Sequence, residues 1–361
     1  MTVTLREVAK LAGVSISTAS RALNGDRSRP VASETQERIW EAVRRLNYEP
    51  NDAAQRLVRR DDGQERHTYN VGLILGNVSY KFTDPFWSPV LNGVDEELVR
   101  QEYHLRFAFT VDDLRRHHQR RLVNRAYIDG LILAARVRPF GDAIGYERTV
   151  VVEDDETRWQ MPLKVDVIAI EKRRAMYAVV KHLAALGRRR IGFLGPAIGV
   201  DERSEAFVEA MGRCDVPLDP DLLVESPWSA EGAYPVAKAL LSRREARVDA
   251  LVCACDTIAV GAMRAAKECG LHLPDDLAIT GFDDISYARD LDPPLTTIHV
   301  PKELMGDLAV RKLIERIDYP DRPPVIQVVP TTLVVRASCG AQGRVSTASK
   351  DKDEEKGGEA G

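Results

Sequence analysis

Three segments within the first 46 residues repeat apolar positions with the period of an α-helix. The first is preceded by Thr4, and Glu7 three positions later completes a capping box, so we expect a helix to begin there. Gly13 then supplies a turn, because glycine adopts a positive φ without steric cost. The apolar positions of this first segment lie on one face: Leu5, Val8, Ala9 and Ala12.

The second segment predicts a helix with two different faces, and Ser15 is placed to cap its start. One face holds Thr18, Ala19 and Ala22, with Leu23 at its edge. The other face holds Ile16, Ser17, Ser20, Arg21 and Asn24. A helix with four polar side chains on its outer face needs a partner there, and a recognition helix in a DNA major groove has this arrangement. The alternative is an ordinary polar surface of a small helical domain.

A third helix is predicted over Ser33–Leu46, with Ile39, Ala42, Val43 and Leu46 on its inner face. Pro50 then interrupts the helical pattern, and Asn51 is suited to cap a new helix over 51–58. This helix of about two turns is too short to be stable alone in water, so we expect it to form only against a partner. Residues 59–68 are polar and read as a linker.

The rest of the chain alternates short apolar strands with amphipathic helices. This order predicts parallel sheets covered by helices, and the length calls for two such sheets. The predicted strands are 71–75, 105–109, 130–134, 148–152, 190–194, 250–253 and 277–281. The predicted helices are 89–101, 173–187, 203–211, 229–243 and 257–270. Ligands of open parallel sheets bind beyond the carboxyl ends of the strands.

The first 57 residues carry two motifs: T-L-R-E-V-A-K-L-A-G-V-S-x-x-T-A-S-R-A-L-N-G and L-N-Y-x-P-N-x-A-A-x-x-L. With them the chain resembles the lactose repressor/galactose repressor (LacI/GalR) family of bacterial transcription regulators, and the resemblance extends to the body. It implies an all-α helix-turn-helix headpiece (1–58, with the hinge helix at 51–58) and an α/β body like a periplasmic binding protein (69–340). The body would contain two doubly wound subdomains, with chain crossings near 168–171, 296–299 and 328–331.

The resemblance implies a homodimer that binds a near-palindromic double-stranded DNA operator. Ile16, Ser17 and Arg21 would face base edges, where an arginine can donate two hydrogen bonds to guanine. Phosphate contacts are expected from Thr4, Ser15, Thr18 and Asn24, with Ser20 on the same outer face. In the hinge, Asn51 would start the helix, and Ala54 and Leu57 would form a minor-groove wedge. The alternative for Leu57 is a linker residue that packs on the body.

The resemblance also implies a small-molecule effector, expected to be a carbohydrate. An aromatic face beside carboxylates and an arginine suits a polyhydroxy ligand. The matching positions are Phe86, Trp87, Arg203, Trp228, Asp256 and Asp283, with Arg136 as a weaker candidate. Structural roles are the alternatives: the aromatic rings in the core, the two aspartates as helix caps, and Arg203 paired with Asp201 or a nearby glutamate. Cys255 and Val300 depart from the polar residues that are usual there.

The distribution of charge along the chain agrees with a division into a DNA-binding headpiece and a ligand-binding body. The chain holds 51 lysines and arginines against 55 acidic residues, a net charge of −4. Residues 1–60 hold 11 against 7, and the remainder holds 40 against 48. A basic module on an acidic body suits a headpiece that approaches phosphates. The tail, 341–361, is rich in Gly, Ser, Lys and Glu and is expected to be disordered.

The sequence gives little support for a metal-binding protein, a membrane protein or an enzyme. The five cysteines lack metal-ligand spacing, so we read them as reduced thiols of a cytoplasmic protein. No apolar run is long enough to cross a membrane. No P-loop, nucleophile elbow or H-E-x-x-H motif occurs, so we expect no enzyme activity, catalytic residue, metal or cofactor. The remaining alternative is a sugar-binding protein of a transport system, against which the headpiece and the absence of a signal peptide argue.

Overall fold

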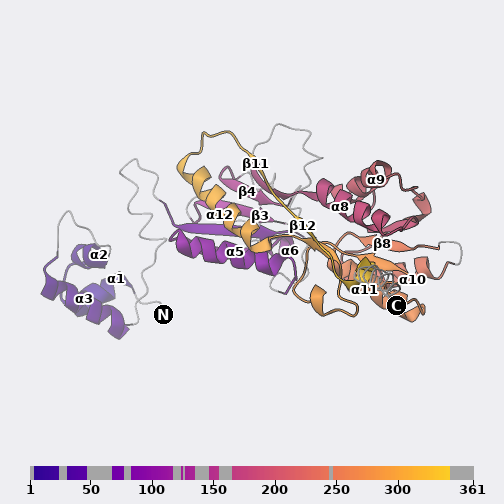
Figure 1. Cartoon of the computed structure of the whole chain (residues 1–361). Helices are drawn as coiled ribbons and strands as arrows, with labels where there is room; N and C mark the ends of the chain where they lie inside the picture. Colours follow the sequence, from indigo (N-terminus) through magenta and orange to yellow (C-terminus); the bar gives the residue numbers. More distant parts are fainter. Residues whose placement is uncertain are drawn as a thin grey trace, which may run out of the picture. The chain divides into compact units, whose positions relative to one another are not determined.

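The structure is a computed structural model. It describes residues 4–23, 31–46, 67–76, 83–116, 123–124, 127–134, 146–153, 165–243 and 247–341. The chain divides into two compact units, Met1–His67 and Thr68–Gly361, which are described separately (Figure 1). The predicted hinge helix at 51–58 and the tail from 342 onward lie outside the described residues.

The first unit contains the three helices expected from the pattern: α1 (Leu5–Ala12), α2 (Ile16–Leu23) and α3 (Ser33–Leu46). The Glu7 carboxylate accepts a hydrogen bond from the Thr4 backbone N–H at 2.7 Å, which confirms the predicted capping box. Gly13 ends α1 in the left-handed conformation with φ 67°, as a tight turn requires. The core of this unit joins all three helices through buried Val8, Ala12, Ala22, Ile39 and Ala42.

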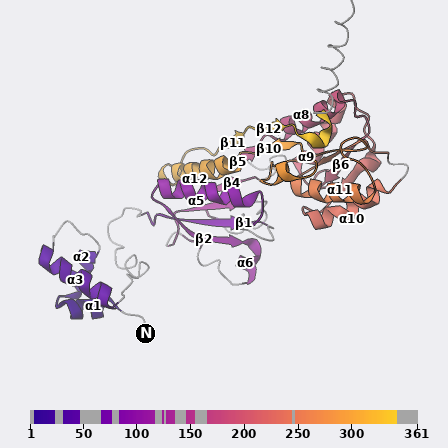
Figure 2. The ribbon, with the colours of Figure 1, turned by 60° about the horizontal axis from the view of Figure 1, so that its bottom comes forward.

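The second unit contains a six-stranded sheet in which every pair is parallel, in the order β11-β5-β4-β3-β1-β2. Its strands are β1 (Asn70–Leu75), β2 (His104–Thr110), β3 (Gly130–Ala134), β4 (Thr149–Val152), β5 (Asp166–Ile170) and β11 (Ile326–Val329). Its helices are α5 (Trp87–Arg100), α6 (Val111–Arg116) and α12 (Lys302–Asp318). The helices α5 and α12 lie side by side on the sheet (Figure 2). Because β1, β3, β4 and β5 are buried almost throughout, they carry near-continuous apolar runs.

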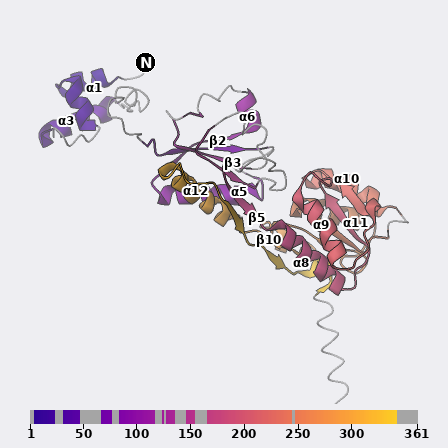
Figure 3. The same ribbon diagram turned by 90° about the horizontal axis from the view of Figure 1, so that it is seen from above.

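A second parallel sheet has the order β7-β6-β8-β9. Its strands are β6 (Ile191–Gly195), β7 (Leu223–Glu225), β8 (Ala250–Cys253) and β9 (Ala278–Thr280). Its helices are α8 (Lys172–Ala185), α9 (Glu202–Arg213), α10 (Ala230–Leu241) and α11 (Asp256–Glu268). Figure 3 shows α8 beside α9 and α10 beside α11. Three short 3₁₀ turns are also described: Pro220–Leu222, Ala288–Asp290 and Ala337–Cys339.

The chain passes between the two sheets at three places. It leaves the six-stranded sheet after β5, returns to it after β10 (Thr297–His299), and leaves again between β11 and β12 (Thr332–Val334). The strands β10 and β12 pair with each other in antiparallel fashion. These passages fall where the crossings were expected, near 168–171, 296–299 and 328–331.

The sequence analysis missed several elements. It expected a crossing near 168–171 but no strand there, whereas the buried strand β5 runs up to this crossing and ends at Ile170. It identified no element at α12, the longest described helix, although Met305, Ala309 and Leu313 are buried at the spacing of one helical face. The predicted strands and helices that lie within the described residues are confirmed, with ends that differ by up to two residues. Such shifts are expected, because caps and fraying decide where an element ends.

We predict that Gly93→Ala lowers the free energy of unfolding by about 1–3 kcal/mol. The helices α5 and α12 approach each other closely at this glycine, and an added Cβ would lie 2.0 Å from the backbone oxygen of Glu303. Backbone cannot rotate away, so the helices would have to separate. Gly212→Ala on α9 is the matched control, because nothing lies within 4 Å of its added Cβ. It should stabilise the protein by up to about 1 kcal/mol. Urea-induced unfolding measures both, and equal midpoints would contradict the close contact.

Candidate functional site

The outer face of α2 is accessible, as a recognition helix requires. Ile16 is 44% exposed and Ser17 is exposed, whereas Ala19 and Ala22 are buried against the other two helices. An exposed isoleucine at the start of a helix is suited to contact a thymine methyl group. The two faces predicted for this helix from the sequence are therefore present in the fold, and the DNA contacts of the exposed face remain a prediction.

Hydroxyl groups cluster at the N-terminus of α2. The Ser15 Oγ accepts a hydrogen bond from the Thr18 backbone N–H at 3.1 Å, which confirms Ser15 as the helix cap. The same Oγ lies 2.8 Å from the hydroxyl oxygens of Ser17 and Thr18. Arg21 folds back along the helix and donates from Nε to the Ser17 carbonyl oxygen at 3.3 Å. A helix N-terminus with accessible hydroxyl groups favours a phosphate, and Arg21 would have to extend to reach a base.

Several predicted positions lie outside the described residues. They are Asn24, Asn51, Ala54 and Leu57 of the expected DNA interface and Arg136 of the expected effector site. Their roles remain predictions.

The second sheet brings four of the predicted effector residues to one edge. Arg203 follows β6, Trp228 follows β7, Asp256 follows β8 and Asp283 follows β9. Because these strands are parallel neighbours, their carboxyl ends meet at the same edge of the sheet, where open α/β sheets bind ligands. This convergence across some eighty residues of chain supports the site derived from the resemblance.

Arg203 is fixed by the start of α9. The Asp201 carboxylate caps that helix by accepting from the Arg203 backbone N–H at 2.9 Å. The guanidinium is buried and donates from Nη1 to the Ala254 carbonyl oxygen at 3.1 Å. It lies between two aromatic rings, with its Cζ 4.7 Å from the ring centre of Phe282 and 5.2 Å from that of Trp228. The alternative that Arg203 pairs with Asp201 or with a nearby glutamate also holds in part. Asp201 lies 3.9 Å from its Nε, and Glu153 lies 3.7 Å from its Nη2.

Asp256 is fully buried at the first turn of α11. Its Oδ1 accepts from the Thr297 hydroxyl at 2.5 Å, and its Oδ2 accepts from the Ile285 backbone N–H at 2.8 Å. Burial raises the pKa of Asp256 to about 7, and these two hydrogen bonds lower it only in part. The side chain therefore joins α11 to the crossing strand β10 as well as lying beside the candidate site.

Asp283 has a buried carboxylate and a backbone φ of 112°, which is rare for a residue with a side chain. Burial raises the pKa of this carboxylate well above its usual range; Asp256 and Glu153 act in the same direction, and Arg203 and Lys302 oppose them. Its Oδ1 has no hydrogen-bond partner among the described residues. A buried polar atom without a partner is costly, so a ligand that forms a hydrogen bond with Asp283 would remove this cost.

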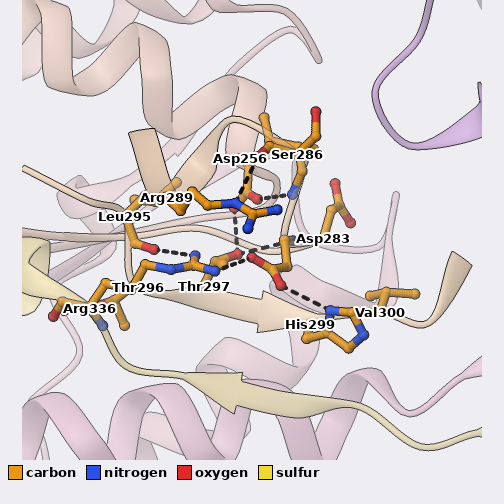
Figure 4. Close-up of polar contacts among 12 residues, drawn as sticks. Asp256, Asp283, Ser286, Arg289, Leu295, Thr296, Thr297, His299, Val300 and Arg336 are labelled. Atoms are coloured by element: carbon orange, nitrogen blue, oxygen red, sulfur yellow. Dashed lines mark hydrogen bonds and ion pairs between the residues drawn. The ribbon is translucent and has the colours of Figure 1, made fainter. Parts of the chain in front are cut away.

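Polar contacts around Asp283 and Asp284 connect the second sheet to β10 and to Arg336, which follows β12 (Figure 4). Asp284 accepts from Arg336 at 2.6 Å and lies 2.9 Å from the ring of His299 on β10. Although burial acts the other way, these contacts hold the pKa of Asp284 below its usual range. Lys302, at the start of α12, donates to the backbone carbonyl oxygens of Asp283 and Asp284. A ligand at Asp283 would thus adjoin the segments that join the two sheets.

Phe86 and Trp87 are partly buried against the main core at the start of α5. Their rings contact each other edge to face, with 4.9 Å between the ring centres. The Asp84 carboxylate holds this turn by accepting from both backbone N–H groups at 2.9 Å. Burial raises the pKa of Tyr287, and the electrostatic effects of Asp256, Cys255 and Asp84 act in the same direction. The core role and the ligand role of the two rings stay open.

Sequence reasoning missed four residues at this site: Glu153, Lys172, Tyr287 and Lys302. Glu153 directly follows the predicted strand 148–152, so the rule that ligands bind beyond strand ends would have marked it. The two lysines are nearly fully buried, which no local pattern reveals. No group of acidic, histidine or cysteine side chains in the described part of the chain is arranged to hold a metal ion. None of its described helices is long and apolar enough to cross a membrane.

Comparison with known proteins agrees with this geometry. Residues 4–51 match the family model for bacterial regulatory proteins of the lacI family, and residues 180–339 match that for periplasmic binding protein-like domains. The ribose operon repressor of Haemophilus influenzae is 33% identical over 341 residues, which are 93% of this chain and 98% of that protein. The chain belongs to the lacI family of bacterial regulatory proteins.

Other proteins of this kind are similar to this chain over most of its length. The HTH-type transcriptional repressor PurR of Haemophilus influenzae is 32% identical, over 88% of this chain and 92% of that protein. Among solved structures, the transcriptional regulator CelR–cellobiose complex is 26% identical with a TM-score of 0.67, over 93% of this chain and 99% of that one. The Lac repressor bound to ONPG in its repressed state is 25% identical with a TM-score of 0.73, over 94% of this chain and 100% of that one. The predicted fold class, a helix-turn-helix headpiece on a periplasmic-binding-protein-like body, is confirmed.

Proposed function

We propose that this protein is a transcriptional repressor whose affinity for a near-palindromic operator is set by a small polyhydroxy ligand. The observation that carries the proposal is one chain with both an accessible recognition helix and a buried Arg203 held between two aromatic rings. The alternative of a transport protein leaves the recognition helix without a use. The cytoplasm, where the operator is, would be its place of action.

The DNA contacts proposed for this chain follow from the positions along α2. Ile16, Ser17 and Arg21 would read bases, and Thr4, Ser15, Thr18 and Ser20 would bind phosphates or line the groove. A homodimer would place two copies of α2 in successive major grooves, with Leu57 of the hinge as a wedge in the minor groove. Asn24, Asn51 and Ala54 complete the proposed interface.

The effector contacts would come from the edge of the second sheet. The ring of Trp228 is 43% exposed and offers a face for the C–H groups of a sugar ring. Arg203 and Asp283 would bind its hydroxyl groups, and Asp256 would hold the site together, with Phe86 and Trp87 contributing from the start of α5. Relatives named for ribose and cellobiose make a carbohydrate the first class to test. Binding would shift the equilibrium between two arrangements of the body, and a coupling of about 1–3 kcal/mol would suffice.

We expect Arg21→Ala to weaken binding of the full chain to its selected operator by about 10- to 100-fold at fixed salt, because a bidentate contact to guanine contributes about 1–3 kcal/mol. Operators are first selected from genomic fragments, and affinities are then measured by gel shift. The salt dependence should change little, since a base contact releases no phosphate counterions.

Arg174→Ala on α8 is the matched control, because it removes the same charge from a side chain that is 77% exposed on the second unit. Its operator affinity should equal that of the parent. If both variants lose the same affinity, net charge is the cause and Arg21 reads no base. If the parent selects no fragment over random duplex, with or without added metabolites, the proposed function fails.

A further inference from the structure

A buried group of charges joins the six-stranded sheet to helices α8 and α9. We call it the Arg203 cluster; its members are Glu153, Lys172, Asp201, Arg203 and Asp283, each at most 8% exposed. The Glu153 Oε2 lies 3.2 Å from the Lys172 Nζ and 3.7 Å from the Arg203 Nη2. Buried charges attract or repel strongly because little water screens them, so this cluster would act on any charge that a ligand brings beside it.

Glu153 is held firmly in its position. It directly follows β4, and its backbone N–H donates to the Ile168 carbonyl oxygen at 2.9 Å. Its Oε1 accepts from the Ile170 backbone N–H at 3.1 Å, which leaves Oε2 directed at the two cations. The carboxylate therefore cannot swing away when a ligand arrives without breaking contacts to the neighbouring strand β5.

The cluster surrounds one guanidinium with three carboxylates. Burial acts the other way, yet the charges of Asp201, Asp283 and Glu153 raise the pKa of Arg203 above its ordinary value. Two buried polar atoms of the cluster lack a hydrogen-bond partner among the described residues: Nε of Arg203, which is a donor, and Oδ1 of Asp283. The Nε of Arg203 therefore has a hydrogen bond to donate to a ligand, and a hydroxyl oxygen can accept it without bringing a negative charge beside Glu153.

We propose that Glu153 is the charge-selecting residue of the effector site, whose carboxylate beside Arg203 excludes anionic ligands and admits uncharged ones. This inference rests on the proposed function, under which the site binds an effector, but its test does not depend on DNA binding. Without Glu153 the Nη2 of Arg203 would lose its neighbouring carboxylate and could donate to an anionic ligand, while Asp201 would still lie 3.9 Å from Nε.

The test measures anion binding to the full chain and to Glu153→Gln, with inorganic phosphate and D-ribonate as probes and calorimetry as the readout. We expect the variant to bind both anions about 10- to 100-fold more tightly than the parent, the range that one neighbouring buried charge produces. Adding Arg203→Ala to Glu153→Gln should abolish the gain. D-ribose, the uncharged counterpart of D-ribonate, should show no such gain.

Glu171→Gln is the matched control, because it removes the same charge one residue before Lys172 from a side chain that pairs only loosely with Arg174, at 3.6 Å. It should bind anions like the parent, and phosphate bound by the headpiece would be common to all variants. Two results would overturn the proposal: a parent that already binds either anion through Arg203, or a folded Glu153→Gln variant without any gain. Operator binding, measured in parallel, reports separately on the proposed function.

Removal of Glu153 takes the ion-pair partner from the buried Lys172, which is destabilising enough to call for a second variant. Glu153→Gln with Lys172→Met removes both charges together and keeps the volume. This double variant should still bind D-ribonate more tightly than the parent, by a smaller factor, because the Nη2 of Arg203 no longer faces a carboxylate. If it binds D-ribonate no better than the parent, Glu153 has a structural role only.

Discussion

Arg203→Ala should abolish the response to the effector while leaving operator binding in place. Arg203 is the cation on which the ligand site is built, and its Nε is buried without a hydrogen-bond partner among the described residues. A hydrogen bond to a charged group contributes about 1.5–3 kcal/mol, so the loss of two such bonds should weaken the effector by about 100-fold or more. The effector is identified first by a thermal-shift screen of sugars and nucleobases, and its action is then measured as the concentration that changes operator affinity by half.

Arg203→Lys is the informative companion, since it keeps the charge and removes the planar fork. It should fold like the parent and still respond poorly, which separates hydrogen-bond geometry from charge. Arg203→Ala leaves the carboxylates Glu153 and Asp283 without this cation, so its unfolding midpoint should fall. A normal response by either variant would remove Arg203 from the effector site.

The free energy of unfolding should fall as the pH rises from 4 to 7, and Asp256→Asn should remove much of this fall. Burial raises the pKa of Asp256 from 3.8 to about 7 in the folded protein. In this window the unfolded chain has lost the proton that the folded protein still holds, so each increase in pH favours unfolding. The full effect of such a shift is on the order of 4 kcal/mol. Urea-induced unfolding between pH 4 and pH 8 measures it.

Asparagine suits this position because its oxygen can accept from the Ile285 N–H while its amide donates to the Thr297 hydroxyl oxygen. The control is Asp284→Asn, whose parent carboxylate has a lowered pKa. Asp284 stabilises the fold above its unfolded pKa and loses that effect only as the pH falls further, so this variant should keep the decline between pH 4 and 7. An Asp256→Asn variant with the same decline as the parent would show that Asp256 is ionised when folded.

Local sequence was sufficient for the headpiece. Each of its three helices has apolar positions on one face, and the first two also have cap or turn residues: Thr4 with Glu7 and Gly13 for α1, and Ser15 for α2. These signals act within one or two turns, so they do not depend on distant parts of the chain. The strands of the body were likewise visible as short apolar runs, since buried parallel strands are apolar on both faces.

The helix α12 and the strand β5 carry local apolar patterns that the sequence analysis did not use, but no local pattern states where they pack. β5 lies in the six-stranded sheet and α12 packs on that sheet, although the second sheet intervenes between them in the chain. The order of strands in a sheet depends on which surfaces bury each other, and nothing within one segment states its partner. The predicted effector residues came from resemblance, and the structure showed that four of them follow neighbouring strands of one sheet.

By itself, the sequence determined that this chain has a helical recognition module followed by alternating strands and helices, because helix periodicity, caps and apolar runs are local properties. Only the tertiary structure brought Glu153 and Lys172 to Arg203 and enclosed Asp256 and Asp283. Charges become selective when several of them share one space without water, and that space exists only after distant strands have packed together.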